Sequence, residues 1–457
     1  MDIRFSPHNL HLEGLGIFTQ QDPNLRALLK QKLVHKSLLL NELPRGKPGI
    51  YTITGGRQIG KTTLLKQWMV QLIKNDTPPE SITYLTGELI DDHHALVRLV
   101  TDSLKQKTQY LLIDEITYVR NWDKGIKYLA DTGSLENITL VLTGTDLVVI
   151  KEARMRFPGR RGLSENVDFH LFPLSFYEYV KLNNRITPEE ICNLVEDETN
   201  TLKKLIDILY EEFKSYLVHG GFLTAINDMA VHNRILPATF ATYSDWIRGD
   251  MLKRNKQEHN LKDLLSGVIE RIGSQVTWNA LSRDLTIDHP KTISDYIEIL
   301  QSMDVLYVQS ALLEDKLAAA PKKAKKVLFS DPFIFHAINA WLNPCEDPFN
   351  MLLRPRIESP ESCSKIVESC IVNQYKRKFP VFYIKAKAEV GIAYIDKNRF
   401  WPIEVKWTGQ LRPKELKQVS KYSNGKILTK SHITGKLQGI PTEPVPLNLL
   451  RLGYPDP

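Results

Sequence analysis

Residues 50–63 read IYTITGGRQIGKTT, a β-branched run that leads into a glycine-rich turn. The turn fits the pattern G-x-x-x-x-G-K-[ST], with Gly55, Gly60, Lys61 and Thr62 at its fixed positions. Glycines let the backbone curl so that several N–H groups point at phosphate oxygens. The run TLLKQWMVQLI that follows predicts a helix, whose N-terminal dipole end favours the same anion. This stretch therefore predicts an α/β fold built around a phosphate-binding loop.

The residues of this loop predict a nucleotide site. We expect nine of them to contact the nucleotide: Gly55, Gly56, Arg57, Gln58, Ile59, Gly60, Lys61, Thr62 and Thr63. Lys61 is expected to reach the β- and γ-phosphates as a point charge, and the Thr62 hydroxyl to ligate Mg²⁺. The alternative is a chance glycine-rich turn, but a strand before the loop and a helix after it favour the functional interpretation.

A second motif follows a buried apolar strand. Residues 110–115 read YLLIDE, which places Asp114 and Glu115 at the carboxyl end of the strand, where open α/β sheets bind ligands. We expect Asp114 to hold Mg²⁺ and Glu115 to polarise the water that attacks the γ-phosphate. The alternative is an Asp-Glu pair that caps a helix, and the phosphate-binding loop upstream favours the first interpretation.

A third apolar strand ends in a run of polar residues. Residues 139–146 read TLVLTGTD, and we expect Thr143 to lie between the acidic pair and the γ-phosphate, where it senses the loss of that phosphate. The alternative is a helix cap at Thr145 or Asp146.

Two arginines further along are candidates for a charge-stabilising role. Residues 158–162 read PGRRG, and the guanidinium of Arg160 or Arg161 suits the charge that develops on a transferred phosphoryl group. Either arginine would act within its own chain or on a neighbouring subunit, so a homo-oligomer is an expected partner arrangement. Solvated loop arginines are the alternative.

Composition limits the classes of protein to consider. The 457 residues exceed what one core organises, and 42% hydrophobic with 25% charged residues are ordinary globular values. A net charge of +7 permits a nucleic-acid partner without requiring one. Four cysteines without a C-x-x-C pair argue against a disulfide framework and a zinc site. No apolar run suits a secretory signal or a membrane span, so we expect a cytoplasmic protein without membrane contact.

Hydrophobic periodicity predicts five successive domains. A parallel sheet with helices on both faces is expected where strand and helix patterns alternate. The predicted ranges are a helical extension at 1–44, the sheet domain at 45–185, a helical lid at 186–255, a winged helix at 256–335 and a small α/β domain at 336–457. Within the extension, leucines at helical spacing predict one helix over Asn24–Leu40.

Four stretches together resemble a known family: GGRQIGKTTLLKQ, LLIDEITYVRNWDKGIKYLAD, LVLTGTDLVVI and PGRRG…FPLSFYEYV. They resemble the AAA-type P-loop ATPases of archaea and bacteria, whose C-terminal domain is often related to restriction-endonuclease-like folds. The resemblance implies ATP as the nucleotide, Mg²⁺ as the cofactor and ATP hydrolysis as the activity. It also implies functional positions for six residues: Lys61, Thr62, Asp114, Glu115, Thr143 and Arg160.

The winged-helix region predicts a DNA contact. A basic cluster follows its expected recognition helix at 291–303, and it comprises Lys316, Lys322, Lys323, Lys325 and Lys326. Such a cluster can track a phosphate backbone by charge alone, so double-stranded DNA is the expected partner. The alternative is a packing module that moves with the nucleotide state.

The tail contains half of a nuclease motif. Ile403-Glu404-Val405-Lys406 resembles the E-x-K half of a PD-(D/E)xK nuclease, in which two carboxylates hold a metal and the lysine activates water. Gly391 stands where the partner aspartate belongs; of the possible substitutes, Glu389 lies about 6.5 Å away along the strand and Asp396 lies at the turn. The alternative is a surface β-hairpin with an alternating Glu-Lys pair. We therefore expect a nuclease-like domain without activity, in an ATPase that acts as a nucleotide-driven switch. The alternative function is a DNA-binding effector or nuclease gated by the ATPase domain.

Overall fold

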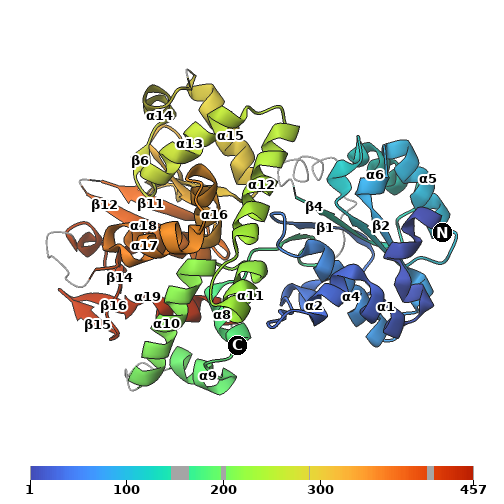
Figure 1. Cartoon of the computed structure of the whole chain (residues 1–457), viewed down its shortest axis with the longest axis horizontal. Helices are drawn as coiled ribbons and strands as arrows, with labels where there is room; N and C mark the ends of the chain where they lie inside the picture. The colour runs from blue at the N-terminus through green and yellow to red at the C-terminus, as the bar shows by residue number, and fades with distance from the viewer. Residues whose placement is uncertain are drawn as a thin grey trace. The chain divides into compact units, whose positions relative to one another are not determined.

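The computed structural model describes residues 2–145, 164–196, 202–287, 289–386, 388–408 and 416–455. The chain divides into two units, Met1–Phe172 and Pro173–Pro457 (Figure 1). The finer predicted division into five domains stays a prediction.

Unit 1 contains a five-stranded sheet in the order β2-β3-β4-β1-β5, with all neighbouring strands parallel. Its strands are β1 (Gly49–Thr54), β2 (Ile82–Thr86), β3 (Tyr110–Asp114), β4 (Thr139–Gly144) and β5 (Asp168–His170). Because β4 lies between β1 and β3, the carboxyl ends of these three strands meet at one edge. The predicted parallel sheet is therefore present, and β5 is a strand that the sequence did not predict.

Side chains of unit 1 alternate between two packed faces, as expected for a sheet covered on both sides. Leu111, Ile113 and Leu140 pack against α5 (His93–Leu104) and α6 (Trp122–Asp131). Leu112 and Val141 face the other way, toward α1 (Leu15–Gln21), α2 (Pro23–Leu29) and α4 (Lys61–Lys74). Figure 1 shows these two helix groups on opposite sides of the sheet.

The single helix predicted over Asn24–Leu40 is wrong. Helix α2 ends at Leu29, and the next helix, α3, covers only Leu39–Glu42. Between them the side chains alternate between exposed and half-buried. No continuous helical face is buried there, and helix propensity alone does not sustain a helix of this length in water.

Helices dominate the first half of unit 2 and recur near its end. They are α8 (Phe176–Asn183), α9 (Pro188–Glu196), α10 (Lys203–His219), α11 (Leu223–His232), α12 (Pro237–Lys253), α13 (Glu258–Glu270), α14 (Trp278–Asp284), α15 (Pro290–Ser302), α16 (Pro332–Leu342), α17 (Arg354–Glu358), α18 (Pro360–Lys376) and α19 (Val445–Gly453). Even α10, α12 and α18 have only 17 residues each. Among the described residues, no helix is both long and apolar enough to cross a bilayer.

Two larger sheets and a small hairpin complete unit 2. The antiparallel sheet β6-β10-β7 joins β6 (Gln275–Val276), β10 (Lys325–Phe329) and β7 (Leu306–Ser310), beside the hairpin of β8 (Leu312–Leu313) and β9 (Ala318–Ala319). The second sheet is mixed, in the order β11-β12-β13-β14-β16-β15. Its strands are β11 (Val381–Lys385), β12 (Glu389–Asp396), β13 (Arg399–Lys406), β14 (Lys426–Thr429), β15 (Gly435–Leu437) and β16 (Ile440–Pro444). A mixed sheet is thus present in the range where the small α/β domain is predicted.

Candidate functional site

The loop between β1 and α4 has a backbone that suits glycine. Gly55 has φ +149° and Gly60 has φ +95°, in the region that L side chains rarely adopt. A Cβ atom on Gly55 would clash with the backbone oxygen of Leu171. Helix α4 begins at Lys61, and its N-cap residue, Gly60, makes no side-chain capping hydrogen bond. The loop therefore presents a close-packed backbone and an uncapped helix N-terminus, the combination that binds phosphate.

Lys61 lies over this loop. Its Nζ donates to the carbonyl oxygens of Gly55 and Gly56 at 3.1 and 2.9 Å, and it lies 3.3 Å from Oε1 of Glu115. The Lys61 side chain is only 4% exposed. Carbonyl oxygens are weak partners for an ammonium compared with a triphosphate, so the cation is available to a phosphate that enters the loop.

Asp114 collects three hydroxyl groups at the end of β3. Its Oδ2 accepts from Thr62 Oγ1 at 2.6 Å and from the Tyr84 hydroxyl at 2.7 Å, and its Oδ1 accepts from Thr143 Oγ1. The structure therefore brings together Thr62 and Asp114, the two predicted metal ligands. A hydroxyl and a carboxylate beside a phosphate-binding loop are the oxygen donors that Mg²⁺ prefers.

Glu115 follows with a left-handed backbone, φ 50° and ψ 48°. This conformation is sparsely populated for a residue other than glycine, and such strain concentrates at functional sites. The Glu115 carboxylate accepts from Thr145 Oγ1 at 2.8 Å, and the Glu115 backbone N–H donates to Thr143 Oγ1 at 2.9 Å. Thr143 thus contacts both acidic residues.

These residues fit a magnesium nucleoside triphosphate. A Cβ would fill the cradle at Gly55, and the hydrogen-bonded oxygens of Thr62 and Asp114 lie at the start of α4 and at the end of β3. The loop, Lys61, the two predicted metal ligands and the carboxylate predicted to polarise water lie together at one edge of the sheet, as expected for parallel strands.

Two family models match parts of the chain. Residues 47–180 match the model of an AAA domain, which covers the loop and both acidic residues. This part of the chain is similar to AAA domains. The predicted resemblance to P-loop ATPases is confirmed for this part of the chain. Residues 210–344 match a domain of unknown function, DUF8612, and the nuclease-like identity of residues 336–457 stays a prediction.

Curated relatives of the chain are found in a bacterium and an archaeon. An uncharacterized protein of Haemophilus influenzae is 26% identical over 273 residues, which are 56% of this chain and 61% of that protein. Two uncharacterized proteins of Methanocaldococcus jannaschii are 28% and 24% identical over 206 and 298 residues. These alignments cover 41% and 62% of this chain, and 41% and 61% of the two proteins. The chain therefore matches less than two thirds of each relative's length.

Solved structures with some likeness include a RuvB variant of Thermotoga maritima, at 17% identity and a TM-score of 0.26, covering 57% of this chain and 81% of that one. Cdc6p of Pyrobaculum aerophilum has 13% identity and a TM-score of 0.25, and the match covers 73% of this chain and 93% of that one. The third is a Drosophila ORC structure bound to DNA, at 12% identity and a TM-score of 0.23, covering 66% of this chain and 83% of that one. TM-scores this low carry no information on function.

Other predicted residues of the loop have local contacts of their own. Gln58 has φ +60° at the tip of the loop, and Ile59 packs into the core beside α4. Arg57 donates to the Tyr118 hydroxyl at 2.6 Å. Arg160, with its neighbours at 158–162, lies outside the described residues. The roles of all these residues stay predictions.

Two contacts of the AAA domain were missed at the sequence level. Thr145 was considered only as a helix cap, yet it holds the Glu115 carboxylate. Tyr84 lies on β2, 30 residues before Asp114, with no motif around it. A polar residue after a buried strand is a signal that would have found Thr145, whereas Tyr84 reads as one more aromatic residue of a buried strand.

The tail motif lies at the end of β13. Glu404 Oε1 is 2.9 Å from Lys406 Nζ, and burial raises the pKa of Glu404 above its usual range. A Cβ on Gly391 would lie 3.1 Å from Oε1 of Glu368, so the Glu368 carboxyl takes the space of the missing side chain. Among the described residues, no group of three or more His, Cys, Asp or Glu is placed to hold a metal ion.

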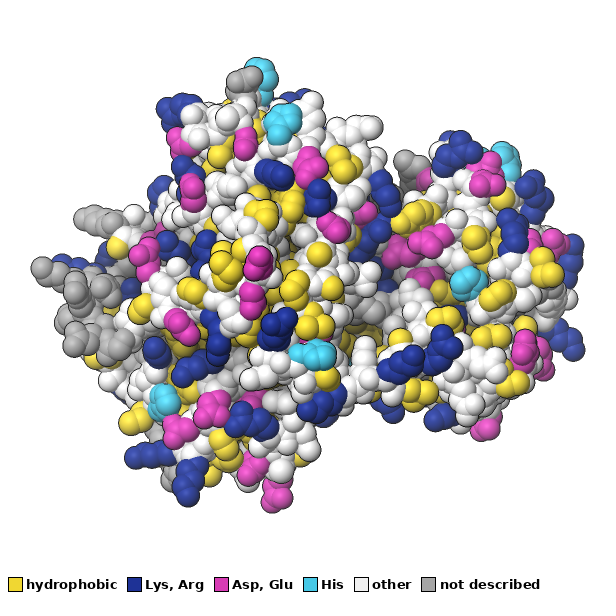
Figure 2. Space-filling view, viewed as in Figure 1, with side chains coloured by type: hydrophobic (Ala, Val, Ile, Leu, Met, Phe, Trp, Pro, Cys, Tyr) yellow, Lys and Arg dark blue, Asp and Glu magenta, His cyan; other side chains and the backbone are white. Residues whose placement is uncertain are grey.

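The predicted basic cluster is smaller than expected, because Lys326 is buried and does not belong to it. Only 1% of its side chain is exposed, and its Nζ pairs with Glu368 at 2.8 Å and with Glu389. Burial alone would lower the pKa of Lys326, but the two carboxylates outweigh burial and raise that pKa above its usual range. Lys322 and Lys323 are exposed. On the face shown in Figure 2, Lys and Arg side chains are spread among Asp and Glu.

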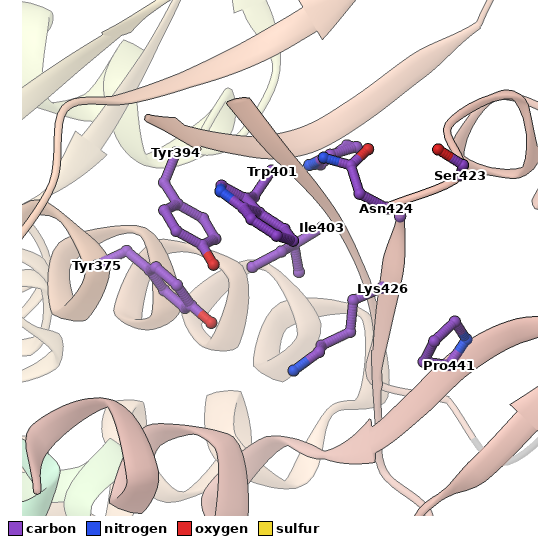
Figure 3. A pocket seen from close by; sticks show the side chains of 10 residues that line it. Tyr375, Tyr394, Trp401, Ile403, Ser423, Asn424, Lys426 and Pro441 are labelled. Carbon is purple, nitrogen blue, oxygen red and sulfur yellow. The ribbon is translucent and has the colours of Figure 1, made fainter. Parts of the chain in front are cut away.

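A cavity of about 250 Å³ lies beside the start of β13. Its rings come from Tyr375, Tyr394 and Trp401, and Lys426 reaches toward it from β14 (Figure 3). The Lys426 Nζ is 3.1 Å from a carboxylate oxygen of Glu443, so the cation of this cavity already has an acidic partner.

Proposed function

We propose that the chain is a magnesium-dependent ATPase whose AAA domain acts as a nucleotide-driven switch. The observation that carries the proposal is the 2.6 Å hydrogen bond between Thr62 and Asp114, next to a lysine that lies over a glycine-rich loop. ATP rather than another nucleotide follows from the resemblance to AAA-type ATPases, because a phosphate-binding loop reads phosphates and not bases.

Each residue has a distinct role in this proposal. The N–H groups of the loop and of the first turn of α4 bind the phosphates, and Lys61 exchanges its carbonyl partners for phosphate oxygens. Thr62 and Asp114 hold Mg²⁺, which neutralises charge on the β- and γ-phosphates. Glu115 orients and polarises the attacking water, and Thr143 couples the positions of the two acidic residues.

The contacts of Glu115 also link the position of its carboxylate to the binding of the γ-phosphate. In this structure the Glu115 carboxylate is shared between Lys61 at 3.3 Å and Thr145 at 2.8 Å. When the γ-phosphate takes Lys61, Glu115 is released toward water while Thr145 keeps it in place.

Double-stranded DNA is the second candidate partner. The helices α13, α14 and α15 with the sheet β6-β10-β7 have the order of elements expected of a winged helix. Lys316, Lys322 and Lys323 are exposed in the segment between β8 and β10. Three exposed lysines suit a backbone contact that carries no sequence information. Arg160 acting on a neighbouring subunit remains the proposed reason for a homo-oligomer.

The test is ATP binding by the wild type and by Lys61→Ala. The variant should bind Mg·ATP about 10 to 100 times more weakly, because a hydrogen bond to a charged group contributes about 1.5–3 kcal/mol. Lys74→Ala, an exposed lysine at the far end of the same helix, is the matched control and should bind as the wild type does. Equal affinity of Lys61→Ala and wild type would contradict the proposal. ATP turnover with and without duplex DNA, alongside mass measurement in each nucleotide state, tests the partner and the oligomer.

A further inference from the structure

We infer that Tyr84 is a positioning residue for Asp114, and that the N-terminal segment (residues 2–22) sets the position of Tyr84. The affinity of the nucleotide site for Mg²⁺ then depends on a segment that contributes no ligand. This inference rests on the proposed function, since it concerns the metal ligand of the same site.

The first observation is the contact between Tyr84 and Asp114. Tyr84 lies opposite Leu112 in the β2–β3 register, so its side chain is on the same face of the sheet as Asp114. The Tyr84 hydroxyl donates to Asp114 Oδ2 at 2.7 Å, and Tyr84 is 1% exposed.

The second observation is the way in which three hydroxyl donors are distributed over the two carboxylate oxygens of Asp114. Thr62 shares Oδ2 with Tyr84, and Thr143 donates to Oδ1. In the proposed function, Thr62 turns its oxygen to Mg²⁺. Tyr84 and Thr143 are then the two donors that keep the carboxylate plane aligned, one on each oxygen. Such outer partners of metal ligands fix their orientation.

The third observation is a buried cation against the Tyr84 ring. Lys66 Nζ lies 3.7 Å from the ring centroid, within cation–π distance, and the Lys66 side chain is 1% exposed. The same Nζ donates to the backbone oxygen of His8 at 2.6 Å and is 3.3 Å from Asp22 Oδ2. The Phe18 ring also lies 5.6 Å from this Nζ. His8, Asp22 and Phe18 of the N-terminal segment therefore all contact this lysine, which also contacts the ring that meets Asp114.

The fourth observation is a direct backbone link. The Asn9 side chain accepts from the Tyr84 N–H at 2.9 Å and donates to the Tyr84 carbonyl oxygen at 2.8 Å. Strand β2 is an edge strand, so Asn9 occupies backbone groups of Tyr84 that a neighbouring strand would otherwise use. The N-terminal segment thus holds both the backbone and the ring of Tyr84.

The test is the Mg²⁺ dependence of binding of a fluorescent ATP analogue by Tyr84→Phe. The variant keeps the ring and loses the hydroxyl, and the Mg²⁺ concentration for half-maximal enhancement of binding should rise by about tenfold or more, the effect typical of removing an outer partner of a metal ligand. Binding in EDTA should stay within about twofold of the wild type, which a general loss of structure would not allow.

Tyr110→Phe is the matched control. Tyr110 is a buried tyrosine at the opposite end of the neighbouring strand β3, and its hydroxyl accepts from the Gly46 N–H at 2.9 Å. It should show the wild-type Mg²⁺ dependence. Asn9→Ala tests the link to the N-terminal segment and should also raise the Mg²⁺ requirement, by a smaller factor than Tyr84→Phe. This second variant keeps the test valid if Tyr84→Phe does not fold.

The outcomes separate this inference from the proposed function. If the wild type binds ATP and Tyr84→Phe has the same Mg²⁺ dependence as the wild type, the inference is overturned and the proposed function stands. An Asn9→Ala with unchanged Mg²⁺ dependence would overturn the role of the N-terminal segment. A wild type without any nucleotide binding would overturn the proposed function and the inference together.

Discussion

Both units of the chain contain a buried lysine beside carboxylates, and the two lysines differ in what surrounds them. Lys61 has one carboxylate partner, Glu115, and two backbone carbonyls of a glycine-rich loop. Lys326 has two carboxylate partners, Glu368 and Glu389, and lies within an antiparallel strand. The first lysine can exchange weak partners for a phosphate, whereas the charge of the second is already neutralised. A buried lysine next to an acid is therefore a candidate phosphate-binding residue only where its present partners bind it more weakly than a phosphate would.

The largest expected effect is on ATP turnover by Glu115→Gln. Loss of the general base should lower turnover by about 10² to 10⁴-fold, while the affinity for ATP stays within a few-fold because the loop and Lys61 are intact. Steady-state phosphate release together with equilibrium binding measures both quantities. If turnover persists at the wild-type rate, Glu115 is not the base, and the surroundings of Lys61 no longer differ from those of Lys326 in catalytic function.

The next effect is on stability, from Lys326→Met. Removing this lysine leaves Glu368 and Glu389 close together without a counter-charge, which should cost about 3 kcal/mol in the free energy of unfolding, at the lower end of the range for a broken buried pair, because both carboxylates keep some solvent contact. Denaturant unfolding of the full chain measures it.

Lys326→Met combined with Glu368→Gln and Glu389→Gln is the matched control for that prediction. The triple variant removes all three charges, so it should recover most of the lost stability. ATP binding should be unaffected in both variants. A single variant as stable as the wild type would show that the lysine is not neutralised in the way described.

The smallest effect comes from restoring the missing acid with Gly391→Asp. The new side chain would crowd the Glu368 carboxyl, 3.1 Å from its Cβ, and add a like charge, so we expect a loss of about 1–2 kcal/mol in stability. We also expect no metal-dependent DNA cleavage. Gly435→Asp, at an exposed glycine of the same sheet, is the control and should change stability little. Cleavage with Mg²⁺ or Mn²⁺ by Gly391→Asp would place the tail among working nucleases after all.

The arrangement of the AAA domain could be predicted because its signals are local. The spacing of Gly55, Gly60 and Lys61 is fixed within one turn, and strand ends are visible in YLLIDE and TLVLTG. Parallel strands bring their carboxyl ends to one edge, so the contact of Thr62 with Asp114 follows from strand order alone, although 52 residues separate them.

The burial of Lys326 could not be predicted in this way. Its sequence neighbours, Lys322, Lys323 and Lys325, are polar and suggest a solvated basic run. Its partner Glu368 lies 42 residues away on α18. No periodic pattern in the sequence indicates that this helix packs against strand β10, which carries Lys326. Tyr84 escaped prediction for a related reason, because the hydroxyl of a tyrosine in an apolar strand gives no sign of the residue it will meet.

The pairing of Asn9 with the edge strand β2 also bears on how chains of this protein meet one another. An open sheet edge invites a strand of a second molecule, and uncontrolled addition of strands leads to aggregates. With Asn9 on the main chain of Tyr84 and His11 Nε2 3.0 Å from the Ile82 oxygen, that side of the sheet is closed by the chain itself. The segment that we propose to position Asp114 thus also keeps this edge of the sheet from pairing with a strand of a second chain.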